Sequence, residues 1–181
     1  METPALIIVD VQKAMDHPRW GERSTPYAEE NMAKLLKFWR AKDWPVFHIQ
    51  DCSPDPTSPY APGQPLHDFK DEVKPIEGEH IIQKSTGNAF IGTDLEKELR
   101  AADANKLVIM GVHIQYCVDA IVRTARYLGF DVTLVSDATV ATAVTSKSGK
   151  IISAEEVHSY TLGLLQSHMK TMSTAEIVEL L

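Results

Sequence analysis

The stretch LVIMGVHIQYCV, residues 107–118, decides the fold of this chain. It begins with an apolar run, residues 107–112, of the kind that forms a strand buried inside a sheet. Cys117 then precedes residues 118–128, whose apolar side chains repeat at helical spacing. Parallel α/β sheets are built from such strand-to-helix units. The stretch therefore predicts an α/β fold with Cys117 at a junction between a strand and a helix.

The same alternation continues along the rest of the chain. Other short apolar runs predict strands at residues 5–11, 45–50, 80–83 and 131–136, and a short edge strand at 170–172. Helical spacing predicts helices at residues 26–42, 94–102, 155–167 and 174–181. This order predicts a single domain over residues 1–181, with a three-layer α/β/α architecture and a mainly parallel central sheet.

Three of these helices have predicted start signals. Thr25 is the expected N-cap of the first helix, with Pro26 at its first position. Thr93 and Ser173 are each followed three residues later by Glu, a pattern typical of a capping box.

Composition excludes several classes of partner. The net charge is −7, from 18 Lys and Arg against 25 Asp and Glu, and no basic cluster is present, which argues against nucleic-acid binding. No apolar run approaches the roughly 20 residues of a membrane span, and the first residues do not resemble a secretory signal. A cytoplasmic location is therefore expected. Its two cysteines, Cys52 and Cys117, are too few for a disulfide framework.

Three stretches lack periodicity. Residues 52–78 contain six prolines and predict a long ordered loop, which either walls a pocket, covers a neighbouring subunit or simply packs as structure. Residues 16–25 and 140–153 are the other irregular stretches.

Three residues follow predicted strands and are expected to meet at one edge of the sheet. They are Asp10, Lys84 and Cys117, and ligands of parallel sheets bind at that edge. Considered singly, each residue has a common structural role: an aspartate after a strand often forms a turn, a lysine there is usually solvated, and a cysteine at the start of a helix usually packs in the core. Together they suit a thiol nucleophile, because the lysine and the helix N-terminus are expected to lower the thiol pKa while the aspartate takes its proton.

The motifs around these residues resemble a known family. Asp10 lies in IVDVQ (8–12), Lys84 in QKSTGNAF (83–90) and Cys117 in GVHIQYCV (111–118). In order and spacing they are similar to the motifs of the isochorismatase-like cysteine hydrolases, a family that includes nicotinamidases. His113 stands where that family usually has a small residue, a difference that re-shapes the pocket and concerns the substrate more than the triad.

The resemblance implies an Asp-Lys-Cys triad and an isochorismatase-like fold. In that mechanism Cys117 attacks an amide-type carbonyl, an amine or ammonia leaves, and water hydrolyses the thioester. Asp10 would be the general base and acid, and Lys84 would balance the charge. Backbone N–H groups of His113 and Cys117 would form the oxyanion hole, next to a cis peptide bond between Val112 and His113.

A metal and a cofactor are not expected. Nicotinamidases carry an Asp and several His after the second strand, and Asp51 fits this pattern, but Ser53 stands where the first His is expected. His67 and His80 lack the paired spacing of a metal site.

The candidate substrate pocket is assigned to Gln12, Trp20, Asn88, Phe90 and Tyr116. The three aromatic rings are expected to wall the pocket, with hydrophobic packing as the alternative. Gln12 is expected to brace the Asp10 loop, and Asn88 to hydrogen-bond the substrate.

The leading hypothesis is a hydrolase that cleaves a C–N bond of a small molecule. A non-catalytic protein of the same fold, binding a ligand or partner, is the alternative, and a thiol redox protein is disfavoured because no Cys-x-x-Cys is present. The family resemblance also implies a homodimer or a larger homo-oligomer.

Overall fold

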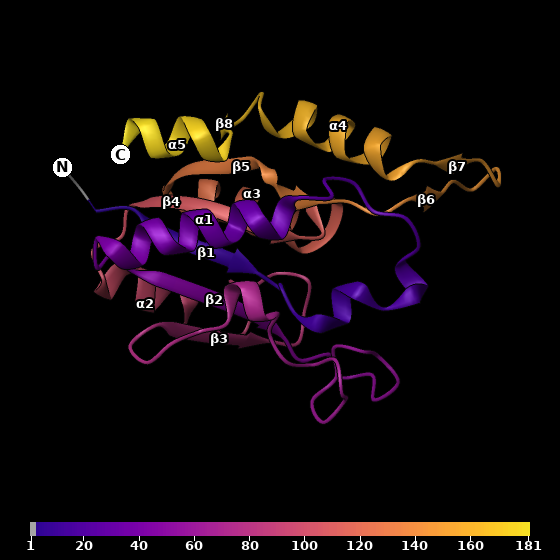
Figure 1. Cartoon of the computed structure of the whole chain (residues 1–181), viewed down its shortest axis with the longest axis horizontal. Coiled ribbons are helices and arrows are strands. Elements are labelled where there is room, and N and C mark those ends of the chain that lie inside the picture. The colour runs from indigo at the N-terminus through magenta and orange to yellow at the C-terminus, as the bar shows by residue number, and fades with distance from the viewer. Residues whose placement is uncertain (1–2) are drawn as a thin grey trace.

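A six-stranded parallel sheet forms the centre of the molecule in the computed structural model, which describes residues 3–181. Its strand order is β3-β2-β1-β4-β5-β8, as Figure 1 shows from bottom to top. The strands are β1 (Ala5–Val9), β2 (Val46–Asp51), β3 (His80–Lys84), β4 (Lys106–Val112), β5 (Asp131–Val140) and β8 (Lys170–Met172). Every neighbouring pair in this sheet is parallel, which confirms the predicted fold class.

Helices cover both faces of the sheet. Helices α1 (Ala28–Ala41) and α5 (Thr174–Leu180) pack on one face, and α2 (Leu95–Ala101), α3 (Asp119–Tyr127) and α4 (Ala154–Leu165) pack on the other. Strand β1 is buried on both sides. Leu6 and Ile8 pack in the hydrophobic core under α1 and α5, and Ile7 and Val9 pack in the core under α2, α3 and α4. Within residues 3–181, none of the helices has the length and apolar character needed to cross a bilayer.

Two of the three predicted helix starts were wrong. The first helix begins at Ala28 because Thr25 has a left-handed φ of 51° and its carbonyl accepts a hydrogen bond from Ala28 N, which makes a separate turn. At the second, the Thr93 hydroxyl accepts from Leu95 N, and no capping box forms. The capping box at Ser173 is confirmed, and Ser153 starts α4 in the same way.

The strand predicted at residues 131–136 is longer than expected, and the stretch 140–153, expected to be irregular, contains regular structure. Strand β5 continues to Val140 because its register against β4 shifts between Ile109 and Gly111. Beyond it, β6 (Val144–Thr145) and β7 (Ile151–Ile152) form a short antiparallel hairpin. Figure 1 shows this hairpin extending away from the sheet at the right.

The loops after β1 and β2 lie at the carboxyl edge of the sheet (Figure 1). The first contains two 3₁₀ turns, η1 (Lys13–Asp16) and η2 (Pro18–Trp20). The second, the proline-rich loop of residues 52–78, consists of turns and one 3₁₀ turn, η3 (Asp71–Val73). Cys117 lies in a π-helical turn, η4 (Ile114–Val118), directly before α3.

Gly111 allows β4 to approach β1 closely. It has a φ of +132°, and a Cβ atom there would lie 2.2 Å from the carbonyl oxygen of Val9. We expect Gly111→Ala to lower the free energy of unfolding by at least about 3 kcal/mol, since backbone cannot move aside as a side chain can. Urea denaturation measures this. Gly87→Ala, where a Cβ would meet nothing within 4 Å, is the control, and equal stability of the two variants would refute the prediction.

Candidate active site

Asp10, Lys84 and Cys117 meet at the carboxyl edge of the sheet. Asp10 follows β1, Lys84 ends β3, and Cys117 lies in the turn after β4. The Lys84 ammonium lies 2.9 Å from Asp10 Oδ2 and 3.5 Å from Cys117 Sγ. Asp10 and Lys84 are both buried. The sheet therefore brings together an acid, a cation and a thiol that are far apart in the sequence.

The backbone of Asp10 fixes the direction of its carboxylate. Its φ is 54°, a left-handed conformation that aspartate tolerates better than most residues. Asp10 N donates to Ile49 O, and Asp10 O accepts from Gln12 N at 2.9 Å. The sharp turn that results directs the side chain toward Lys84. Uncommon backbone conformations of this kind concentrate at functional sites.

Burial dominates the electrostatics of the site. It raises the pKa of Asp10 to about 6, although the charge of Lys84 opposes the shift. Burial, together with the charge of Asp10, also raises the pKa of the Cys117 thiol to about 12, again against the influence of Lys84. The expectation of a lowered thiol pKa was wrong, because sequence spacing does not reveal how deeply the sulfur is covered. At neutral pH the resting site holds an ionised Asp10 beside a protonated thiol.

One oxygen of Asp10 is free to accept a proton. Lys84 occupies Oδ2, whereas Oδ1 is buried and has no hydrogen-bond partner among residues 3–181. The Cys117 thiol is a neighbour of this carboxylate, and each group shifts the pKa of the other. The geometry thus supplies an acceptor for the thiol proton.

The turn before Cys117 begins with the cis peptide bond between Val112 and His113 that the resemblance implied. His113 O accepts from the backbone N–H groups of Tyr116 and Val118, which close the turn. Burial, and then the charge of Arg23, lowers the pKa of His113 to about 4, so its ring is neutral at pH 7.

Two of the predicted pocket aromatics lie around His113. The ring of Trp20 is 4.7 Å from that of His113, and its Nε1 donates to Ala14 O. The Tyr116 ring lies edge-on to His113 at 6.3 Å, and this residue is 53% exposed. Phe90 instead packs on the core side, 6.2 Å from the ring of Phe130.

The side-chain amides of Gln12 and Asn88, both assigned to the candidate pocket, form hydrogen bonds to other groups of the protein. Gln12 is fully buried, and its side chain bonds to both the N and O of Asp51 and to His67 O. It braces the Asp10 loop as expected, but its contacts leave no amide group for a substrate. Asn88 donates to Thr124 Oγ1 and accepts from Phe90 N, so it holds its own loop in place.

Sequence reasoning missed Tyr60, which lies in the proline-rich loop. Its ring is buried and lies edge-on to Trp20 at 6.1 Å. Burial, with added repulsion from Asp10, Asp51 and Cys117, raises the pKa of its hydroxyl well above 10. A loop without periodicity gives no signal of which side chain faces inward, so only the density of prolines marked this region.

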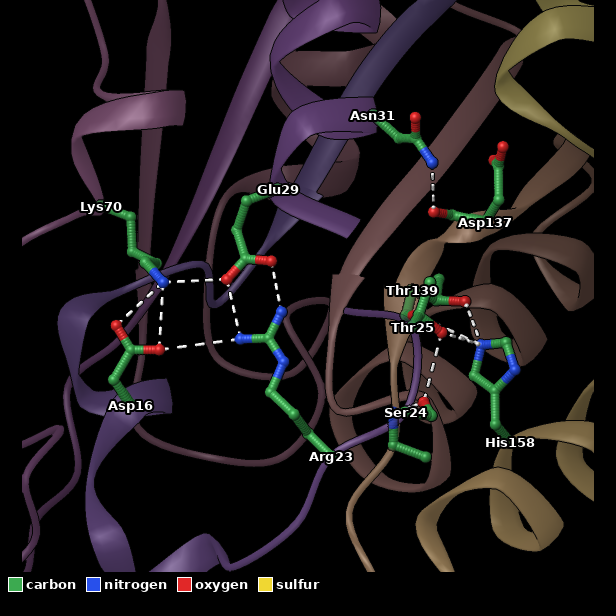
Figure 2. A network of polar contacts seen from close by, with 11 residues as sticks. Asp16, Arg23, Ser24, Thr25, Glu29, Asn31, Lys70, Asp137, Thr139 and His158 are labelled. Atoms are coloured by element: carbon green, nitrogen blue, oxygen red, sulfur yellow. Dashed lines mark hydrogen bonds and ion pairs between the residues drawn. The ribbon is translucent and has the colours of Figure 1, made fainter. Parts of the chain in front are cut away.

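An ion-pair cluster holds both covering loops against α1. Figure 2 shows Arg23 bonded to Glu29 and Asp16, with Lys70 bonded to the same two carboxylates. The Ser24 hydroxyl accepts from Ala141 N beside it. The Trp20 loop and the end of the proline-rich loop therefore share one anchor, which sequence spacing did not reveal.

The anchor predicts a pH dependence of stability. Burial alone would raise the pKa of Glu29, but the hydrogen bonds that Glu29 accepts from Arg23 and Lys70 lower it to about 2. A depressed pKa stabilises the fold above the unfolded value of 4.5 and loses that effect as the pH falls toward 2. We expect Glu29→Gln to lower the free energy of unfolding by about 1–2 kcal/mol at pH 7, allowing for solvent screening.

Chemical denaturation at pH 7 and at pH 3 measures this difference. The gap between the natural protein and Glu29→Gln should narrow at the lower pH. Glu30→Gln, at the neighbouring exposed position on α1, is the control and should leave stability unchanged. A gap that stays constant between the two pH values would count against the ion-pair anchor.

The surroundings of Asp51 do not assemble a set of metal ligands. Its carboxylate lies 3.8 Å from the Lys84 ammonium, and Cys52 Sγ lies 4.0 Å from His67 Nε2. Among residues 3–181, no three His, Cys, Asp or Glu side chains are grouped so that they could hold a metal ion. His80 pairs with Glu98 instead.

Two surface hollows lie away from these groups. One of about 640 Å³ lies between α1 and α5, and another of about 830 Å³ lies beside α4 and the hairpin. Neither is lined by Asp10, Lys84 or Cys117. The chemistry of the side chains, and not the size of a hollow, therefore marks the candidate site.

Comparison with known proteins gives a consistent result. Residues 4–174 match the family model of the isochorismatase domain. An uncharacterised isochorismatase family protein of Bacillus subtilis, YrdC, is 40% identical over 97% of this chain and 94% of its own length. A putative hydrolase of the isochorismatase family from Chromobacterium violaceum superposes with a TM-score of 0.95 at 43% identity, over 99% of this chain and 93% of that one. Streptothricin hydrolase of Streptomyces noursei is 35% identical over 74% of this chain and 48% of its own length.

Proposed function

This chain belongs to the isochorismatase family of hydrolases, and from that premise we propose that it is a cysteine hydrolase that cleaves the C–N bond of a small amide. One observation carries the proposal: the Lys84 ammonium contacts both the Asp10 carboxylate, at 2.9 Å, and the Cys117 sulfur, at 3.5 Å. A thiol, a proton acceptor and a charge-balancing cation are the groups that thioester chemistry requires. Asp10, Lys84 and Cys117 are the proposed triad.

The first half-reaction forms a thioester. Asp10 removes the thiol proton as Cys117 Sγ attacks the carbonyl carbon, and the negative charge develops on the carbonyl oxygen. The N–H groups of His113 and Cys117 are proposed to bind that oxygen. Asp10 then returns the proton to the nitrogen as the C–N bond breaks, and an amine or ammonia leaves.

The second half-reaction uses water. Asp10 accepts a proton from a water molecule while the water oxygen attacks the thioester carbonyl. The C–S bond breaks, the acid product leaves, and the proton returns to Cys117. With a pKa of about 6, Asp10 is close to the value that suits both accepting and donating a proton at neutral pH. Lys84 keeps its charge throughout, because the neighbouring carboxylates raise its pKa more than burial lowers it.

A non-catalytic binding protein remains the second candidate, and the raised thiol pKa of about 12 favours it. A thiol that stays protonated is a weak nucleophile. The two candidates differ in whether Asp10 can accept the proton during attack. A small-molecule ligand, a homo-oligomeric assembly and a cytoplasmic location belong to both proposals.

Hydrolysis of a panel of small amides, lactams and imides, with the products identified by mass spectrometry, tests the proposal. The natural protein should hydrolyse at least one member of the panel, releasing an amine or ammonia from an open-chain amide or forming a ring-opened acid from a lactam or imide. Cys52→Ala should match it, because this second thiol makes no contact with Asp10 or Lys84 among the described hydrogen bonds. If members of the panel bind but none is hydrolysed, the non-catalytic candidate is favoured.

A further inference from the structure

The hydroxyl of Tyr60 has no hydrogen-bond partner in the part of the chain that the structure describes. The residue is only 6% exposed, yet its oxygen makes no hydrogen bond to any group within residues 3–181. Buried polar atoms nearly always have a partner, so an unpaired one beside a reactive centre indicates a group that is bound from outside the chain.

The proline-rich loop holds Tyr60 in a fixed position. Its carbonyl accepts from Ser53 N at 3.3 Å and bonds with His67 Nδ1 at 2.9 Å, while its own N donates to the Ser58 hydroxyl. Gln12 binds His67 O in turn and ties this loop to the Asp10 loop. The position of Tyr60 is therefore tied to the loop that carries Asp10.

The ring of Tyr60 is part of the aromatic cluster beside the candidate site. Tyr60 contacts Trp20 at 6.1 Å between ring centroids, and Trp20 contacts His113 at 4.7 Å. Asp10, Asp51 and Cys117 all act on the hydroxyl electrostatically, and the pKa is raised well above 10. The group consequently stays protonated and remains a hydrogen-bond donor at any pH at which the protein works.

We propose that the Tyr60 hydroxyl donates a hydrogen bond to the substrate. The inference rests on the proposed hydrolase function and adds a substrate class to it. The scissile carbonyl oxygen is already assigned to the N–H groups of His113 and Cys117, so Tyr60 must bind a second acceptor. The rings of Tyr60, Trp20, His113 and Tyr116 form a chain of neighbouring aromatic contacts, which favours a flat molecule. The substrate class is therefore a planar amide with a second acceptor, of which cyclic imides are the simplest example.

Two probes of the same shape test this assignment. Phthalimide has two carbonyls, and isoindolin-1-one has the same fused ring with one. Their dissociation constants are measured by calorimetry on the full-length Cys117→Ala protein, so that neither probe is cleaved. We expect phthalimide to bind about tenfold more tightly, the size of one good hydrogen bond. Adding Tyr60→Phe should remove that preference.

Tyr127→Phe is the matched control, because it removes a hydroxyl from a residue that is 82% exposed on α3. It should keep the full preference for phthalimide. The melting temperature of Tyr60→Phe should be unchanged or higher, since the variant removes an unpaired buried hydroxyl and keeps the ring. A preference that survives Tyr60→Phe overturns the assignment, as does equal weakening of both probes. Failure of the Cys117→Ala protein to bind either probe overturns the substrate class.

Failure of the hydrolase proposal gives a different pattern. If Tyr60→Phe removes the preference but the protein with Cys117 intact neither opens phthalimide nor forms an adduct with any amide, the Tyr60 site stands and the hydrolase proposal fails. If amides are cleaved but Tyr60→Phe keeps the preference for phthalimide, the hydrolase proposal stands and the Tyr60 assignment fails.

Discussion

Changing Cys117 to alanine is expected to lower kcat/KM for any amide substrate by at least about 10,000-fold, because no other group on the chain replaces the sulfur as nucleophile. The fold should survive, since the residue is only partly buried and the change removes a single atom. Steady-state kinetics measures the loss, and circular dichroism confirms folding.

Cys52→Ala is the matched control for this prediction. Cys52 is also partly buried, and burial raises its pKa as it does that of Cys117, but its thiol lies 4.0 Å from His67 and has no place in the triad. Its activity should stay within about twofold of the natural protein, as expected for a residue that only packs. Comparable losses in the two variants would show that neither thiol is the nucleophile.

Changing Asp10 to asparagine is expected to lower kcat/KM by about 100- to 10,000-fold, the usual contribution of a general acid–base group. Asparagine keeps the size of the side chain but cannot take the thiol proton. Because the thiol pKa is raised to about 12, thiolate formed without Asp10 is scarce at neutral pH. The loss should therefore shrink as the pH rises.

The natural protein should show the complementary pH dependence. Asp10 must be ionised to act as a base, and its pKa is raised to about 6. Activity should fall about tenfold for each pH unit below that value, and this acid limb should be absent in Asp10→Asn. Rates of the natural protein and of Asp10→Asn are compared between pH 4.5 and 9, about the range in which the fold is expected to persist. An unchanged acid limb in Asp10→Asn would assign the titration to another group.

The sequence was most informative where regular elements position a side chain. Asp10, Lys84 and Cys117 could be placed at one edge because each follows a recognisable strand, and parallel strands all end at the same edge. The structure confirms that these groups meet. Their chemical roles remain a proposal.

The misses have a common physical origin. The pKa of Cys117 depends on burial, which is a property of the assembled fold and not of the helix that follows it. Tyr60 and the cluster around Glu29 bring together loops that have no periodic pattern from which to read a buried face. The shifted register of β5 likewise depends on its pairing with β4, beyond the reach of local sequence.

The most direct test is the mass of the protein during turnover. An amide that releases its nitrogen is mixed with the natural protein and with Cys117→Ala, the reaction is quenched in acid, and intact masses are recorded with peptide mapping. The account predicts an added mass equal to the acyl half of the substrate, carried by the peptide that contains Cys117 and absent from Cys117→Ala. Turnover by the natural protein at full rate with no adduct, or an adduct on Cys52, would contradict it.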